Sequence, residues 1–116
     1  MEDLKFIENY LNRYKSSLFK TDVSKQIIKM KEMLVEIKKN GSKVIIAGNG
    51  GSAAIASHVT VDFTKQGGIR TVNFNEPDLI TCFANDYGYE RWIAKAVEFY
   101  GDEGDLVILI SSSGNS

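Results

Sequence analysis

Two short loops in this sequence combine residue types that bind anions, and the first is rich in glycine. It runs from residue 48 to residue 52 and follows directly after a β-branched run. Glycines allow backbone N–H groups to approach an anion closely, and the N-terminus of a following helix adds partial positive charge. This order of strand, glycine loop and helix predicts a phosphate-binding site. Its candidate ligand contacts are Asn49, Gly50, Gly51 and Ser52.

The second loop is rich in serine and follows the apolar run Leu106–Ile110. Each serine hydroxyl can donate one hydrogen bond to a phosphate oxygen, so hydroxyls and backbone amides can hold a phosphate monoester without lysine or arginine. A serine run can also be a flexible linker. The apolar strand that leads straight into it favours a binding loop. The candidate contacts are Ser111, Ser112, Ser113 and Ser116.

His58 and Asp62 lie one helical turn apart in the segment after the glycine loop. A carboxylate base and a proton-shuttling acid are the usual tools for moving a proton between adjacent carbons. Three roles stay open, in this order of preference: a pair that braces the helix, substrate contact or catalysis, and two ligands of a divalent metal such as zinc. Zinc usually takes three or four ligands. The sequence indicates no other cofactor.

Strands that alternate with helices must position these residues. We expect strands over 43–47, 69–74 and 106–110 and helices over 53–64, 77–84 and 89–100, with a turn at 85–88. This alternation predicts a doubly wound α/β fold with a parallel sheet. The unbroken apolar run 106–110 is expected at its centre, and the less apolar 69–74 at an edge. Both loops follow strand carboxyl ends, which places them at one edge of the sheet.

Two amphipathic helices are expected in residues 1–40, ahead of a second domain over 41–116. Their apolar stripes are Leu4, Ile7, Leu11, Tyr14 and Leu18, then Val23, Ile27, Met30, Leu34 and Ile37. We interpret them as a helical hairpin. It either covers the core of its own chain or packs against another subunit.

Composition excludes several classes of protein. The net charge of −1 gives no strong field for nucleic acid or an anionic membrane. The longest apolar run is far too short to span a bilayer. The single cysteine, Cys82, excludes an internal disulfide and is expected to be buried. No secretory signal is visible at the start, so a cytoplasmic location is expected.

Together with Ala84-Asn85-Asp86-Tyr87-Gly88, the two loops resemble the sugar isomerase (SIS) domains of phosphoheptose isomerases and their relatives. The resemblance covers nearly the whole chain and corresponds to the N-terminal part of such a domain. It implies a flavodoxin-like three-layer fold and a homo-oligomer, a dimer or tetramer, with the N-terminal helices at its interfaces. It also implies a sugar phosphate as ligand. The implied phosphate contacts are Ser111, Ser113 and Ser116, with Ser112 close by, and the implied sugar contacts are Asn49, Ser52 and Asp86.

The activity implied by the resemblance is aldose–ketose isomerisation through an enediol, of the sedoheptulose 7-phosphate and heptose 7-phosphate type. In that family a His and, four residues later, a Glu base follow the glycine loop. Here the positions hold His58 and Asp62, whose carboxylate is shorter by about 1.5 Å. The family's catalytic His and a further metal-type ligand come from a C-terminal part beyond Ser116. We therefore expect the 116-residue chain alone to be inactive and, through an open strand edge, prone to associate.

Two other functions compete with the isomerase. A non-catalytic SIS module that senses phosphosugars or binds a protein is favoured by the shortened carboxylate of Asp62. A dinucleotide-dependent protein is suggested by Gly48, Gly50 and Ala53, which match that fingerprint. The fingerprint requires an acidic residue at the end of the second strand, where this chain has Asn73, so the dinucleotide reading is disfavoured.

Overall fold

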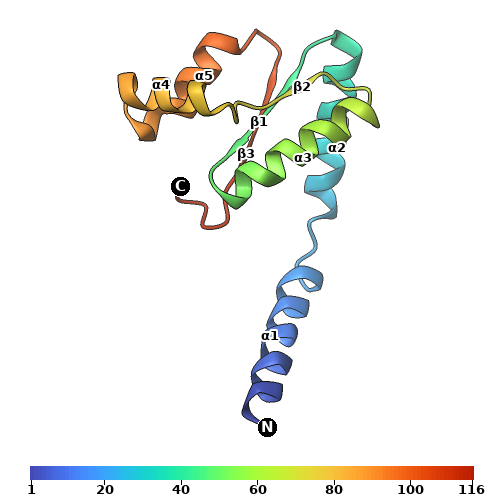
Figure 1. The fold of residues 1–116 in the computed structure, drawn as a ribbon. Helices are drawn as coiled ribbons and strands as arrows, with labels where there is room; N and C mark the ends of the chain where they lie inside the picture. Colours follow the sequence, from blue (N-terminus) through green and yellow to red (C-terminus); the bar gives the residue numbers. More distant parts are fainter. The chain divides into compact units, whose positions relative to one another are not determined.

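One fully apolar strand forms the centre of the sheet. The computed structural model describes every residue from Met1 to Ser116. Strand β1 (Val44–Gly48) is buried along its whole length. It lies between β2 (Thr71–Val72) and β3 (Leu106–Ile110) and runs parallel to both. Figure 1 shows β1 and β3 side by side along their length.

Helices cover both faces of this sheet, because successive side chains of β1 point to opposite sides. On one face, helix α3 (Gly51–Lys65) and the end of α2 (Ser24–Asn40) pack on the sheet through Ile37, Val44, Ile46 and Ala56. On the other face, α4 (Pro77–Tyr87), the 3₁₀ turn η1 (Tyr89–Arg91) and α5 (Trp92–Tyr100) follow one another, and the core there is Ile45, Phe74, Trp92 and Ala96. The fold is therefore the doubly wound α/β arrangement that the sequence predicts (Figure 1).

The N-terminal segment contains the two expected helices, α1 (Glu2–Phe19) and α2. The chain divides into two compact units, Met1–Glu32 and Met33–Ser116, with the division within α2. The domains expected over 1–40 and 41–116 stay a prediction. Helix α1 buries none of its residues, and its apolar stripe is exposed. The helical hairpin stays a prediction. None of the helices has both the length and the apolar character that crossing a membrane requires.

The strands differ from expectation in two respects. Only Thr71 and Val72 of the expected strand 69–74 pair with β1. The strand expected at the centre, β3, lies at the edge, and β1 holds the centre. The side chains of β3 that face away from α3 are consequently open, with Val107 39% and Leu109 66% exposed. The expectation that 106–110 forms the central strand was wrong, because β3 pairs with β1 on one side and with no strand on the other.

Helix α4 is longer than expected, and it changes the setting of Cys82. It continues through Asn85 and Asp86 to Tyr87, and Gly88, with a φ of 89°, ends it. The predicted turn at 85–88 is thus reduced to its glycine. Cys82 lies on the exposed side of α4, so the expectation of a buried cysteine was wrong.

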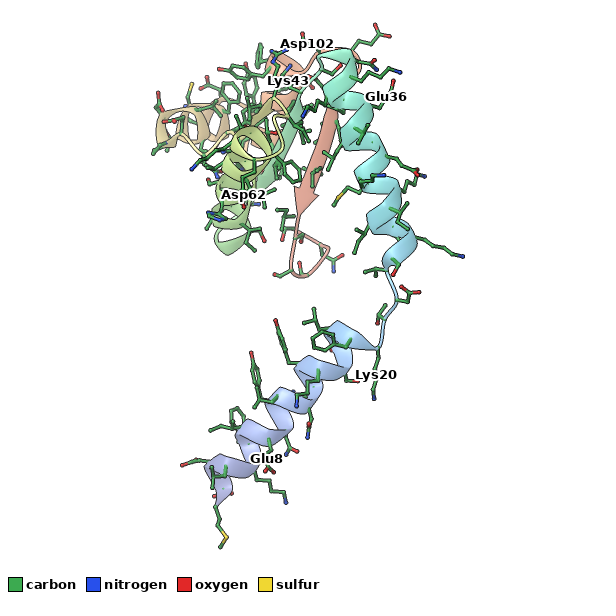
Figure 2. All side chains as sticks on the ribbon, turned by 90° about the vertical axis from the view of Figure 1, so that its right-hand side faces the viewer. Glu8, Lys20, Glu36, Lys43, Asp62 and Asp102 are labelled. Atoms are coloured by element: carbon green, nitrogen blue, oxygen red, sulfur yellow. The ribbon has the colours of Figure 1, made fainter.

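A polar cluster joins the residues just before β1 and β3, at the amino-terminal ends of the strands. The two loops follow the carboxyl ends of the same strands. The Lys43 ammonium lies 2.6 Å from Asp102 and 2.5 Å from Asp105 (Figure 2). The Asp105 carboxylate, 5% exposed, also accepts the backbone N–H groups of Lys43 at 2.9 Å and Asp102 at 2.8 Å. Burial raises the pKa of Asp105, but these hydrogen bonds outweigh it and hold the pKa below its usual value.

Candidate functional site

The ladder between β1 and β3 sets the distance between the two predicted loops. Gly48 pairs with Ile110, so Asn49 and Ser111 leave neighbouring strands at the same level. The strands approach closely at this point. A Cβ atom on Gly48 would lie 2.9 Å from the carbonyl oxygen of Ile110 and 2.7 Å from Cβ of Ser52. Glycine is therefore required where the first loop begins.

The glycine loop leads into a helix end that no side chain neutralises. Gly50 has a φ of 57°, a conformation that favours glycine, and it precedes the first residue of α3. The backbone N–H of Ser52 donates to the carbonyl of Asn49 at 3.0 Å, which closes the turn. No side chain caps this N-terminus, and the first turn holds no acidic residue. Its partial positive charge is thus available to an anion.

Hydroxyl groups hold the serine loop together. The Ser111 oxygen accepts the backbone N–H of Gly114 at 2.9 Å, and its hydroxyl donates to Ser116 at 3.2 Å. The Ser113 and Ser116 oxygens lie 3.5 Å apart. The hydroxyls of Ser111, Ser113 and Ser116 thus form one cluster. The Ser112 hydroxyl makes no hydrogen bond and is not part of it.

Both loops line one cavity of about 860 Å³ on the α5 side of the sheet. Its polar lining comprises Asn49, Tyr89, Glu90, Glu98, Ser111 and Ser116. Its apolar lining includes Trp92, Ile93, Val97, Val107 and Leu109. No lysine or arginine lines it, and its lining includes neither Gly50, Gly51 and Ser52 at the start of α3 nor Ser112 and Ser113. The glycine loop and the serine loop, predicted to share one edge of the sheet, do meet there.

His58 and Asp62 lie on α3 and do not line this cavity. Their side chains are 80% and 45% exposed, and His58 Nε2 lies 3.5 Å from Asp62 Oδ2. Asp62 Oδ1 also accepts a hydrogen bond from Gln66 Nε2 at 3.4 Å (Asp62 is labelled in Figure 2). The chain brings no third His, Cys, Asp or Glu to this pair. The two side chains therefore do not fit a zinc site by themselves.

Asp86 also lies apart from the cavity, in the last turn of α4. Its Oδ2 atom is 3.7 Å from the Cys82 sulfur, which donates to it, and its Oδ1 accepts Asn85 Nδ2 at 3.1 Å. The negative charge of Asp86 raises the pKa of the Cys82 thiol. Asp86, the predicted sugar contact, thus accepts its hydrogen bonds from residues of its own helix.

The structure adds Tyr89, which the sequence did not single out. It begins the 3₁₀ turn, and its hydroxyl donates to Asn49 Oδ1 at 3.2 Å, which joins the start of the α5 region to the glycine loop. Glu90 beside it also lines the cavity. The sequence signal for both residues was only their position directly after Gly88.

Comparison with known proteins finds relatives that match most of this chain. The chain is 43% identical over 97 residues to the phosphoheptose isomerase of Fusobacterium nucleatum, covering 79% of this chain and 50% of the relative. It is 33% identical over 116 residues to that of Aneurinibacillus thermoaerophilus, covering 95% and 59%. The solved phosphoheptose isomerase of Francisella tularensis superposes with a TM-score of 0.90 at 28% identity, over 100% of this chain and 64% of that one.

The chain spans about half the length of the curated relatives it matches. The SIS domain family matches residues 6–116. With both loops at one cavity on a doubly wound sheet, the chain belongs to the SIS domain family.

Proposed function

We propose that the complete gene product binds a sugar phosphate and interconverts its aldose and ketose forms through an enediol. The substrate pair proposed is sedoheptulose 7-phosphate and heptose 7-phosphate. The observation that carries this proposal is the single cavity lined by Asn49 of the glycine loop and by Ser111 and Ser116 of the serine loop. Relatives that match nearly all of this chain bear the name phosphoheptose isomerase.

This chain offers more hydrogen-bond donors for the phosphate of the ligand than for its sugar. The hydroxyls of Ser111, Ser113 and Ser116 lie within one hydrogen-bonded cluster and each can turn to donate to a phosphate oxygen. The uncapped N-terminus of α3 supplies partial positive charge beside them. Gly50, Gly51 and Ser52 form this helix end, and Asn49 is proposed to reach the sugar. Of the proposed contacts, only Asn49, Ser111 and Ser116 line the cavity. Ser112 and Asp86 rank lowest because they also lie outside the hydrogen-bonded serine cluster and the N-terminus of α3.

Proton transfer is proposed to use Asp62 as base with His58 beside it. Both are exposed and only loosely paired on α3, so their side chains are available to a ligand. Because they do not line the cavity of their own chain, we propose that they act on the cavity of a second copy. A divalent metal at this pair would need further ligands from outside the chain. The assembly is proposed to be a dimer or tetramer, located in the cytoplasm.

Solvent exchange tests the proposed reaction. The complete gene product is incubated in D₂O with sedoheptulose 7-phosphate, and deuterium entry at C1 of the ketose and C2 of the aldose is followed by NMR. We expect exchange in the wild type. Asp62→Asn should remove exchange while leaving binding intact. Ser116→Ala should weaken binding by about tenfold or more, because a hydrogen bond to a charged group contributes roughly 1.5–3 kcal/mol.

The matched control for the serine variant is Thr64→Ala, which removes an exposed hydroxyl on α3 that makes no hydrogen bond. It should bind as the wild type does. A wild-type protein that binds the sugar phosphate without any exchange would refute the isomerase and support the sensing module. That second function is favoured by one observation, the position of Asp62 outside the cavity.

A further inference from the structure

A tyrosine hydroxyl restrains the one amide side chain in the cavity. Tyr89 and Asn49 are forty residues apart in the sequence, and the Tyr89 hydroxyl donates to Asn49 Oδ1 at 3.2 Å. Both side chains line the cavity, together with Ser111 and Ser116. The contact therefore lies within the proposed ligand site and not behind it.

The direction of this hydrogen bond determines what Asn49 can offer a ligand. An asparagine amide carries an acceptor, Oδ1, and a two-proton donor, Nδ2, which have nearly the same shape. Without a partner the group can present either end. With Oδ1 engaged by Tyr89, Nδ2 is the end left for a ligand. A donor at this place matches the carbonyl and hydroxyl oxygens of a sugar.

We infer that Tyr89 is a positioning residue, which fixes the Asn49 amide so that its donor end faces the sugar portion of a bound sugar phosphate. The inference rests on the proposed function. Tyr89 is not proposed to contact the phosphate. The proposed phosphate contacts are the serine loop and the N-terminus of α3. It predicts that loss of the Tyr89 hydroxyl affects recognition of the sugar and spares recognition of the phosphate.

The surroundings of Tyr89 allow its hydroxyl to be removed without disturbing the core. The side chain is mostly exposed, and its ring belongs to neither of the aromatic clusters, Phe74 with Tyr100 and Phe83 with Tyr87 and Phe99. Tyr89→Phe is therefore expected to fold normally. Tyr100→Phe is the matched control, because Tyr100 is also half-exposed, lies outside the cavity and has a hydroxyl without a hydrogen bond.

Two ligands and a double-mutant cycle test the inference in the complete gene product. Affinities for sedoheptulose 7-phosphate and for inorganic phosphate are measured by calorimetry. Tyr89→Phe should weaken binding of the sugar phosphate by about 3- to 10-fold and change phosphate binding by less than about twofold, while Tyr100→Phe changes neither. In an Asn49→Ala background, Tyr89→Phe should add no further loss.

Three results would overturn the inference: an equal loss for both ligands, a full Tyr89 effect that persists without Asn49, or no effect on either ligand. A wild type that binds no sedoheptulose 7-phosphate would refute the proposed function instead. In that case the Asn49 side-chain N–H resonances of the free protein decide the matter. A shift in Tyr89→Phe that is absent in Tyr100→Phe supports the positioning role, and unchanged resonances contradict it.

Discussion

At the scale of single residues, Asp105 shows how a buried charge couples this fold to pH. Its carboxylate accepts two backbone N–H groups and the Lys43 ammonium, so its pKa in the folded chain lies below the unfolded value. A group of this kind stabilises the fold above its unfolded pKa, near 3.9. The contribution is lost as the pH falls through the lower, folded pKa.

Asp105→Asn is therefore expected to lower the free energy of unfolding by about 1.5–3 kcal/mol at pH 7, the range for hydrogen bonds to charged groups. The difference from the wild type should begin to shrink as the pH falls below about 4, because the unfolded wild-type chain then binds a proton at Asp105 that the folded chain does not. Urea denaturation at pH 7 and at pH 3 measures both quantities. Glu103→Gln, which removes an exposed carboxylate from the same loop, is the control. An equal difference at both pH values would contradict the assigned role.

At the scale of elements, β3 presents an apolar edge. Leu109 is 66% exposed on a strand whose outer backbone groups have no partner. Exposed apolar edge strands pair with other chains. We expect the 116-residue chain to self-associate through β3. Leu109→Lys should weaken that association without a measurable loss of stability.

Sedimentation velocity over a range of concentrations measures the association. Thr64→Lys adds the same charge on an exposed position of α3 and should associate as the wild type does. If Leu109→Lys sediments as the wild type does at every concentration, β3 is not the contact.

The elements also show where prediction from the sequence succeeds. The apolar runs at β1 and β3 and the glycine loop between strand and helix predicted their structures to within one or two residues, because a short unbroken apolar run bounded by turn residues is a strong strand signal. The run did not predict burial, since only β1 is buried on both faces. Local composition misled at Asn85 and Asp86, where a polar pair taken for a turn completes α4 and only Gly88 ends it.

The candidate site was predictable only in part for a related reason. Strand order and parallel pairing place the two loops together, and both features follow from the sequence pattern. Tyr89 was missed because its hydrogen bond to Asn49 joins segments forty residues apart, which no local pattern indicates. His58 and Asp62 lie outside the cavity because α3 covers the opposite face of the sheet, and spacing alone does not determine which face a helix covers.

At the scale of the whole molecule, the chain leaves a large apolar surface uncovered on α1. Ile7, Leu11 and Tyr14 recur on the helix and are about half exposed. Full burial of such a side chain contributes about 1.5–3 kcal/mol, which favours an arrangement that covers the stripe. We expect a second copy to do so.

Leu11→Glu should weaken assembly of the complete gene product by about tenfold or more, because it places a charge in the covered stripe. Mass measured by light scattering after size exclusion reports the change. Asn12→Glu adds the same charge at the neighbouring exposed position of α1 and should leave the mass unchanged. An unaltered mass for Leu11→Glu would exclude the stripe from the interface.

The pairing of Gly48 with Ile110 carries a consequence for anyone who redesigns this protein. Because the ladder fixes the separation of the loops, we expect an insertion in an exposed connection between β1 and β3 to leave the loops aligned. A deletion of one residue inside Leu106–Ile110 has the opposite effect. Side chains along a strand alternate between its faces, so the deletion would turn Ser111 toward the opposite layer of the fold.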